Sequence, residues 1–521
     1  MNRLVKTENG YVRGLPASDP RITSFKGIPF AAPPVGENRW RAPQPCADWE
    51  GELHAYEFGP IGMQDRGKPG RDNFWSREWA VDFDLPMSED CLYLNVWAPA
   101  DGYRVGAADQ YRETEDTPIP EPGNLPVYVW FFGGGLQVGN TAEMEFDGER
   151  IARRGIVVVT VSYRLNVFGF MAHPDLTKEA PDAPANFGFL DQQYAVQWVK
   201  RNIAAFGGDP NNITIGGQSS GGMSVCAHLA NPANRGLFQK AILESGLFFP
   251  CYSTRNMFRI DLSTAEERGA AFLKELGAST IEEARKIDAE TLLNKANTMP
   301  PHTFDAVVDN AYCKAASADW YLQEGHVECP IFFSSTDIEM LVSPRVTDNA
   351  SLRKLAESLE GVDVERFMQL FDGADTPEEI RKKGAIPGID FAAHVIRRIA
   401  GDKNPLWLAQ FSGEIPGWDH PGAFHSSDIW FYFETLAKCW RNFTGKSYDL
   451  SRQMCDYWAN FIRSGDPNGM GTDGKMLPEW PALDEEKPVR MEFGETAKLG
   501  SAAPNEIMAM MIDVYVKNHT K

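Results

Sequence analysis

Residues 216–222 contain a serine flanked by glycines in the pattern G-x-S-x-G, with Ser219 at its centre. The apolar run at residues 213–215 predicts a strand before this serine, and the apolar spacing over residues 223–229 predicts a helix after it. A turn this tight strains the serine backbone and leaves no space for side chains beside it, which explains the glycines at positions 217 and 221. The N-terminus of the helix also favours negative charge near the serine. We therefore predict that Ser219 is the nucleophile of an acyl-transfer reaction.

A second glycine-rich stretch, residues 133–135, directly follows a predicted strand at residues 127–132. Acyl transfer needs backbone N–H groups aimed at the oxyanion, each worth about 3 kcal/mol, and glycine lets the backbone approach a tetrahedral centre closely. Neither of the phosphate-binding patterns G-x-x-x-x-G-K-[ST] and G-x-G-x-x-G is present here. A purely structural turn is the alternative, but together with Ser219 the stretch predicts an oxyanion-binding loop.

A serine nucleophile also needs a general base, which in this kind of site follows the acid along the chain. Four histidines lie beyond residue 390, namely His394, His420, His425 and His519. His425 directly precedes a strand-like run at residues 429–433, and a loop at a sheet edge is a suitable place for a base. A lone histidine is often purely structural, and periodicity does not exclude His420.

Two carboxylates compete for the role of the acid that orients the histidine. Asp337 and Glu339 both follow a predicted buried strand at residues 331–333. The residues alone do not decide between them, and a carboxylate in this place is also a common helix cap.

The elements that must position these residues alternate between strands and helices. Apolar runs predict buried strands at residues 92–97, 127–132, 157–161, 213–215, 241–243 and 331–333, and helical spacing marks residues 192–202. This alternation predicts an α/β fold with a mostly parallel central sheet and helices on both faces. Residues 253–310 and 345–420 look helical, with little strand signal, and are expected to form lid and pocket insertions. Residues 101–125 are polar and proline-rich and predict a surface loop. We find no repeat and no linker, so residues 1–521 are predicted to form one domain.

Composition excludes several other classes of protein. The 521 residues carry a formal net charge of −21, which repels nucleic acid and anionic membranes. The N-terminus has no apolar core typical of a secretory signal, and no apolar run reaches the roughly 18 residues of a membrane span. The eight cysteines show neither CxxC pairs nor zinc-finger spacing, so we expect free thiols, a cytoplasmic location and no metal.

Motifs along nearly the whole chain resemble the type-B carboxylesterases, a family that includes cholinesterases and bacterial p-nitrobenzyl esterases. The resemblance rests on residues 25–31, 33–36, 88–96, 162–164, 191–193, 206–210, 465–469 and 480–481, together with the serine and glycine stretches above. It implies the α/β-hydrolase fold, with Glu339 as the acid and His425 as the base. It also implies oxyanion donors at Gly134, Gly135 and Ser220. Ion pairs Arg39–Glu89 and Arg164–Asp191 are expected by the same resemblance.

The sequence departs from the family in ways that bear on the substrate. Cys91 matches a cysteine that secreted relatives pair in a disulfide, but Met63 stands in the partner position, so that disulfide is expected to be absent. Gln218 replaces the glutamate that usually precedes the nucleophile. Since cholinesterases use that charge near a cationic substrate, the neutral amide argues against choline esters. Trp75 or Trp79 could still supply an aromatic wall.

The resemblance implies a serine carboxylesterase that hydrolyses neutral small-molecule esters through an acyl-enzyme, without metal or cofactor. We expect Leu136, Gln218 and Phe249 to contact the substrate, and a monomer or small homo-oligomer. A hydrolase of feruloyl or other phenolic esters, or of carbamates or amides, would carry the same triad, so only the pocket distinguishes these alternatives. A non-enzymatic adhesion protein of the same fold is a further alternative, but such proteins typically lack a triad member.

Overall fold

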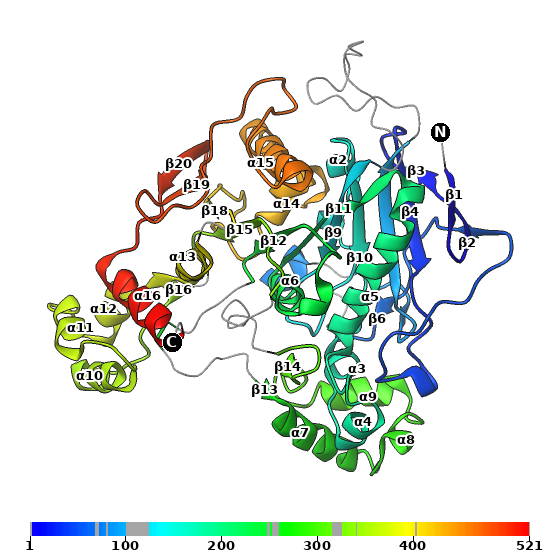
Figure 1. Ribbon diagram of the computed structural model, residues 1–521, viewed down its shortest axis with the longest axis horizontal. Helices are drawn as coiled ribbons and strands as arrows, with labels where there is room; N and C mark the ends of the chain where they lie inside the picture. The colour runs from blue at the N-terminus through cyan, green and yellow to red at the C-terminus, as the bar shows by residue number, and fades with distance from the viewer. Residues whose placement is uncertain are drawn as a thin grey trace.

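The computed structural model describes residues 3–67, 72–79, 82–100, 124–246, 251–252, 260–314, 326–339, 341–401 and 404–519. A central sheet of 11 strands dominates the structure (Figure 1). In spatial order its strands are β20 (Ala497–Ser501), β19 (Val489–Phe493), β18 (Leu406–Phe411), β15 (Ile331–Thr336), β12 (Lys240–Glu244), β11 (Gly208–Gln218), β9 (Leu125–Phe131), β10 (Val157–Val161), β8 (Tyr93–Pro99), β4 (Ile22–Pro29) and β3 (Leu15–Pro16).

The strands from β10 to β19 run parallel to their neighbours, and antiparallel pairs close both ends of the sheet. All six strands expected from the sequence lie within β8, β9, β10, β11, β12 and β15, apart from one residue before the start of β8 and one after the end of β9, so those predictions are confirmed. The prediction of little strand signal in residues 345–420 is wrong at β18, which pairs in parallel with β15. Of the predicted surface loop, residues 101–123 lie outside the described residues.

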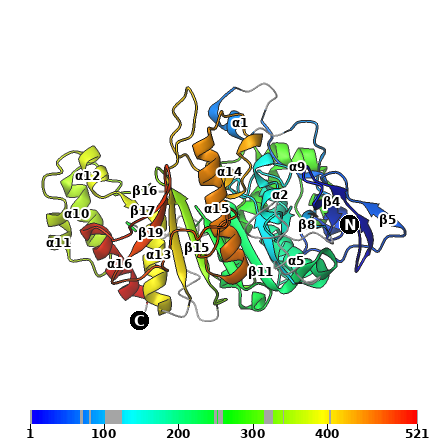
Figure 2. The ribbon, with the colours of Figure 1, turned by 90° about the horizontal axis from the view of Figure 1, so that it is seen from above.

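Two hydrophobic layers cover the two faces of the sheet, because successive strand residues point to opposite sides. In β9, Val127, Val129 and Phe131 join a layer with helices α5 (Phe187–Asn202), α6 (Ser220–Ala230), α13 (Gly388–Ala400) and α16 (Glu506–His519). Tyr128 and Trp130 point the other way, into a layer with α2 (Glu149–Ala152), α14 (Ile429–Tyr432) and α15 (Gly445–Ser464). Figure 2 shows α14 and α15 lying along the sheet. The fold is therefore an α/β sandwich of three layers.

The remaining helices gather in two groups at the periphery (Figure 1). One group contains α4 (Pro174–Glu179), α7 (Leu262–Glu275), α8 (Ile281–Ala284) and α9 (Ala289–Ala296), beside α3 (Asn166–Phe170). The other contains α10 (Asn349–Ser358), α11 (Val364–Leu370) and α12 (Pro377–Lys383), against α16. Helices α7 to α12 confirm the helical character expected of residues 253–310 and 345–420, whose role as lid and pocket insertions stays a prediction.

The short elements outside the central sheet complete the fold. They are α1 (Phe74–Glu78), an N-terminal sheet of β1 (Leu4–Thr7), β2 (Gly10–Arg13) and β5 (Glu52–His54), and the pairs β6 (Ile61–Gly62) with β7 (Met87–Ser88), β13 (Ile260–Asp261) with β14 (Val307–Val308), and β16 (Leu341–Val342) with β17 (Ile386–Pro387). Among the described residues, no helix combines the length and apolarity needed to cross a membrane.

Candidate active site

Ser219 occupies the sharp turn between β11 and α6, at the carboxyl edge of the parallel sheet. Its backbone lies at φ 56° and ψ −123°, a conformation that costs roughly 1–3 kcal/mol for a residue with a side chain. A Cβ on Gly221 would lie 2.1 Å from the Phe131 carbonyl oxygen, and one on Gly217 would lie 2.4 Å from the backbone of Gly221. The two flanking glycines are therefore required by space, as the sequence predicts.

The glycine stretch after β9 folds over the same edge and contacts Ser219. A Cβ on Gly133 would lie 3.1 Å from the Ser219 Cβ, and a Cβ on Gly134 would lie 2.0 Å from the Val138 carbonyl oxygen. Gly134 and Gly135 have φ of 105° and 66°, in the region that favours glycine. The loop is fastened to α6 because the Leu136 N–H donates to the Ser220 Oγ at 3.0 Å.

The N–H groups of Gly134, Gly135 and Ser220 donate to no other described residue. Ser220 is buried, Gly135 is half-buried and Gly134 is exposed. Backbone N–H groups that have no partner within the described part of the chain and lie beside the Ser219 hydroxyl are suited to bind an anionic oxygen that a reaction creates.

His425 and Glu339 meet on the other side of Ser219. The His425 Nδ1 hydrogen bonds to the Glu339 Oε2. The Glu339 Oε1 accepts from the Ser245 hydroxyl and, at 2.8 Å, from the Thr336 N–H. These bonds fix the carboxylate on the imidazole, and this orientation is what the acid of a triad must provide.

The alternatives to these two residues lie apart from the site. The side chain of Asp337 makes no hydrogen bond to His425, and its backbone N–H donates to the Phe411 carbonyl in the sheet. His420 is exposed to solvent. The arrangement thus brings together Glu339 and His425, which the resemblance had selected, and not their competitors.

The second nitrogen of His425 contacts Gln218, whose amide nitrogen lies 3.2 Å from the His425 Nε2. An amide N–H can only donate, so the Nε2 accepts and the ring proton sits on Nδ1, facing Glu339. This is the tautomer that a general base requires. Burial lowers the pKa of His425, but the Glu339 hydrogen bond and the charges of Glu339 and Asp428 outweigh it, so the pKa is raised above its ordinary value.

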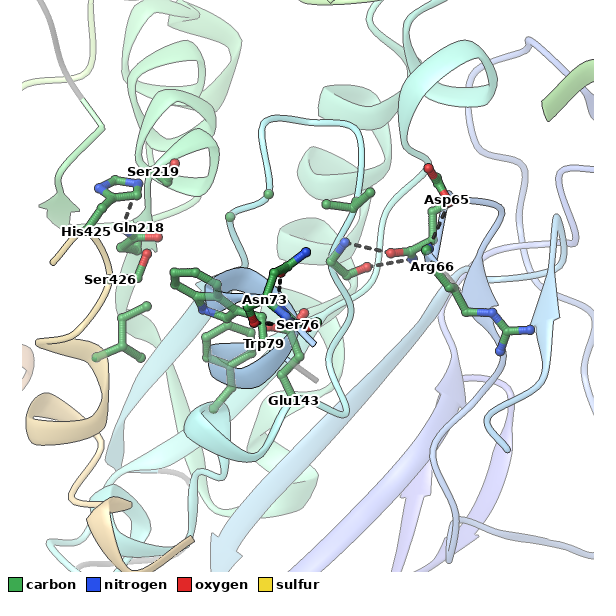
Figure 3. Close-up of a pocket in the computed structure, with 18 of the residues that line it drawn as sticks. Asp65, Arg66, Asn73, Ser76, Trp79, Glu143, Gln218, Ser219, His425 and Ser426 are labelled. Atoms are coloured by element: carbon green, nitrogen blue, oxygen red, sulfur yellow. Dashed lines mark hydrogen bonds between the residues drawn. The ribbon is translucent and has the colours of Figure 1, made fainter. Parts of the chain in front are cut away.

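A cavity of about 690 Å³ opens onto Ser219 and His425. Figure 3 shows its labelled residues in three groups: Ser219, His425, Gln218 and Ser426 at one end, Asn73, Ser76, Trp79 and Glu143 in the middle, and Asp65 and Arg66 at the other end. Burial raises the pKa of Glu143, an acid in the wall of the cavity, to about 7. The cavity is the place where a substrate of moderate size would lie.

The residues expected to contact the substrate do not all line the cavity. Gln218 and Trp79 line the cavity, whereas Leu136 is fully buried and does not line it. Phe249 and the side chain of Trp75 lie outside the described residues.

Ser245 is a residue of the site that the sequence analysis missed. It follows β12, the strand beside β11, and has a left-handed backbone with φ 50°. Its position after a parallel strand next to the nucleophile strand was the available signal, because such strand ends meet at one edge.

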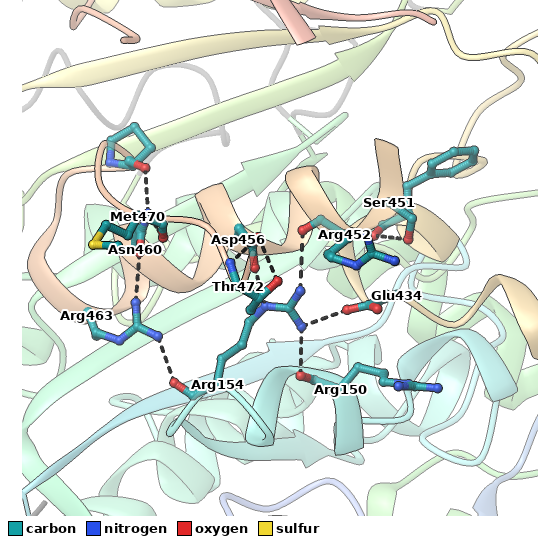
Figure 4. Close-up of polar contacts among 12 residues, drawn as sticks. Arg150, Arg154, Glu434, Ser451, Arg452, Asp456, Asn460, Arg463, Met470 and Thr472 are labelled. Atoms are coloured by element: carbon teal, nitrogen blue, oxygen red, sulfur yellow. Dashed lines mark hydrogen bonds and ion pairs between the residues drawn. The ribbon is translucent and has the colours of Figure 1, made fainter. Parts of the chain in front are cut away.

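The segment after His425 is anchored by a buried ion network around Arg154 (Figure 4). The Arg154 guanidinium is 2.7 Å from Asp456 on α15 and 2.7 Å from Glu434, which follows α14.

The apolar run at residues 429–433, expected to be a strand, instead forms helix α14. Its four residues are all buried in the layer with α15, where a helix satisfies its own backbone and needs no strand partner.

Ion pairs also hold the cavity wall. Arg441 binds Glu78 at the end of α1, and the side chains of both are 1% exposed. The expected pairs Arg39–Glu89 and Arg164–Asp191 are present at 2.6 and 2.7 Å. Cys91 forms no disulfide, as expected, and neither does any of the other seven cysteines.

The sheet order, the strand-turn-helix at Ser219 and the helices on both faces define an α/β-hydrolase fold. The sequence matches the Carboxylesterase family over residues 1–383 and 386–511. It is 30% identical over 515 residues to the para-nitrobenzyl esterase of Bacillus subtilis (strain 168), covering 93% of each chain. It is also 31% identical to the cholinesterase of Mus musculus, covering 92% of this chain and 82% of that protein. A solved PNB esterase structure superposes with a TM-score of 0.76 at 28% identity, covering 98% of this chain and 99% of that one.

The chain therefore belongs to the carboxylesterase family and is a carboxylic ester hydrolase.

Proposed function

We propose that the protein hydrolyses neutral carboxylic esters through an acyl-enzyme on Ser219, with His425 as base and Glu339 as the acid that orients it. The observation that carries the proposal is the convergence of these groups on one cavity, with three unpaired N–H donors beside Ser219.

In the first half-reaction the His425 Nε2 removes the Ser219 proton as the hydroxyl oxygen attacks the ester carbonyl. For this step the Gln218 amide must yield the Nε2 to Ser219, which is a small rearrangement of the kind that substrate binding produces. The N–H groups of Gly134, Gly135 and Ser220 bind the oxyanion. The alcohol leaves with the proton from His425, and a water activated by the same nitrogen then hydrolyses the acyl-enzyme.

A neutral substrate fits the charges of the cavity. Beside Ser219 stands Gln218, which carries no charge. At the far end, Asp65 and Arg66 carry opposite charges, and between the two ends burial raises the pKa of Glu143, which favours its neutral form. The cavity therefore offers no strong net field to select a cationic ester, although the overall charge of the chain is negative.

The test compares wild type and Ser219→Ala on p-nitrophenyl acetate, followed by a panel of p-nitrophenyl esters of increasing chain length, methyl ferulate and a choline ester. We expect Ser219→Ala to abolish hydrolysis, and the neutral esters to be turned over far faster than the choline ester. Wild-type activity in Ser219→Ala would disprove the nucleophile. Preference for the choline ester would disprove the argument from Gln218, and preference for methyl ferulate would identify a phenolic-ester hydrolase.

A further inference from the structure

Two carboxyl groups outside the proposed triad, those of Glu244 and Asp428, lie buried behind it. Glu244 is the last residue of β12, paired with Gln218 of β11 on one side and Ser334 of β15 on the other. Asp428 is the N-cap residue of α14, on the segment that follows His425. Both residues are 0% exposed to solvent. Burial of two acids without a neighbouring lysine or arginine is costly and asks for an explanation.

Few hydrogen-bond donors from other residues reach these two carboxyl groups. Both oxygens of Glu244 and the Oδ1 of Asp428 accept nothing from N–H or O–H donors of other described residues. The Oδ2 of Asp428 has only a long contact of 3.5 Å from the Ser334 hydroxyl, which also lies 3.0 Å from the Tyr432 hydroxyl. The two carboxyl groups hydrogen bond to one another. Since an ionised carboxyl can only accept, one of the two must carry a proton.

We propose that Glu244 and Asp428 share one proton and act as positioning residues, whose single negative charge sets the protonation equilibrium of His425. The inference rests on the proposed function of His425 as the base. In this arrangement the pair balances the imidazolium that forms during acyl transfer. Two charges would hold His425 protonated and unable to accept a proton, whereas no charge would leave the imidazolium without support.

The surroundings of the pair favour this state. The titratable groups that face it are Tyr128 of β9, Glu339 after β15, His425 and Tyr432 of α14. Among the described residues, neither carboxyl forms an ion pair with a lysine or arginine.

The direction of each pKa shift agrees with a shared proton. Burial, reinforced by the charge of Glu339, raises the pKa of Asp428 to about 7. Burial and the neighbouring Asp428 raise the pKa of Glu244 well above its ordinary value. The proton is therefore expected to reside mainly on Glu244, with Asp428 carrying the charge nearer to His425.

Two neutral substitutions are expected to affect the pH dependence of the activity differently. Asp428→Asn removes the charge beside His425, so the low-pH limb of kcat/KM for p-nitrophenyl acetate should move to lower pH by roughly one unit. Glu244→Gln supplies an amide N–H to Asp428 in place of the shared proton and keeps the single charge, so the limb should stay near its wild-type position. A purely structural role would change the amplitude in both variants and leave the limb in place. An unmoved limb in Asp428→Asn, or an equal displacement in Glu244→Gln, would overturn the proposal.

Glu145→Gln is the matched control. Glu145 is also a buried acid with a raised pKa, but its electrostatic partners are Glu143 and Glu78 rather than Asp428. Its removal should leave the low-pH limb where it is in the wild type, and a displacement equal to that of Asp428→Asn would overturn the assignment to this pair.

Infrared spectroscopy tests the shared proton without relying on turnover. The spectrum of the wild type at neutral pH should contain the band of a protonated carboxylic acid that is missing from the double variant Glu244→Gln/Asp428→Asn. The same band should persist in Ser219→Ala, so failure of the proposed nucleophile and failure of this inference are separate outcomes. If the double variant does not fold, the single variant Glu244→Gln takes its place, because it removes the carboxyl that mainly carries the proton, and an unchanged protonated-acid band in that variant overturns the proposal.

Discussion

Replacing Glu339 by glutamine should inactivate the protein by fixing the wrong tautomer of His425. At present the Glu339 Oε1 accepts from the Ser245 hydroxyl and the Thr336 N–H, while the Oε2 accepts from His425. A glutamine has one oxygen, and the two existing donors should hold it. Its amide N–H₂ would then face the His425 Nδ1 and donate to it, so that the ring proton moves to the Nε2. An Nε2 that carries the proton cannot remove one from Ser219.

The magnitude follows from the chemistry of this base. A triad histidine held in the wrong tautomer costs about 10⁴-fold in kcat, which is equivalent to about 5.4 kcal/mol of transition-state stabilisation. The assay is steady-state hydrolysis of p-nitrophenyl acetate, with far-ultraviolet circular dichroism and thermal unfolding to show that the variant is folded. Since the substitution is isosteric, we expect the loss to lie in kcat with little change in KM.

Asp337→Asn is the matched control. Asp337 is the neighbouring carboxylate that the sequence alone could not exclude, and it does not contact His425 in the structure. This variant should keep activity within about threefold of the wild type, since it leaves every hydrogen bond of the triad in place. The reasoning would be refuted if Glu339→Gln kept more than a tenth of wild-type kcat, or if Asp337→Asn caused the larger loss.

Three further predictions follow from the same geometry. The pKa of His425 is raised above its ordinary value, and a base acts only when it is deprotonated. In a pH series, the low-pH limb of kcat/KM should therefore have its midpoint above pH 6.5. A midpoint below 6.5 would contradict the electrostatics of the site. Gly134→Ala places a Cβ 2.0 Å from the Val138 carbonyl oxygen, so it should lower kcat by about 10²–10³-fold through displacement of an oxyanion donor, and unchanged turnover would remove the loop from the mechanism. Arg154→Met removes the guanidinium from the carboxylates of Asp456 and Glu434 and should cost about 3–5 kcal/mol of unfolding free energy in a denaturant titration, whereas Arg353→Met at an exposed pair should leave the midpoint unchanged.

The parts of the site that sequence predicts best are those fixed by local spacing. The glycine spacing around Ser219 is a local pattern, although the contact that requires Gly221 comes from Phe131 on β9 and was not visible in the sequence. The strand before it and the helix after it also have strong local signals. Residues 133–135 were recognisable for the same reason.

The choice between Asp337 and Glu339 was different, because it depends on how the chain turns after β15. The Asp337 N–H continues the sheet by donating to Phe411 of β18, and only then does the chain turn so that Glu339 reaches His425. The strand β18 itself was not predicted, so this register could not be worked out from the residues. The resemblance to a family was needed to select Glu339.

Two errors in secondary structure have one physical origin. The apolar run at residues 429–433 was interpreted as a strand and is helix α14, while the apolar run of β18 was overlooked inside a helical region. Short runs that are buried on all sides have no periodicity to distinguish strand from helix. Their state is decided by distant partners, which are α15 for the first and β15 for the second.

The most direct test of the account is covalent labelling of the nucleophile. A p-nitrophenyl organophosphate ester transfers its phosphoryl group to an activated serine hydroxyl and releases p-nitrophenolate, and the modified peptide can be identified by mass spectrometry. The account predicts one phosphoryl group per chain, located on Ser219, with loss of esterase activity in proportion to labelling. Labelling of a different residue, or full activity after Ser219 is modified, would contradict it.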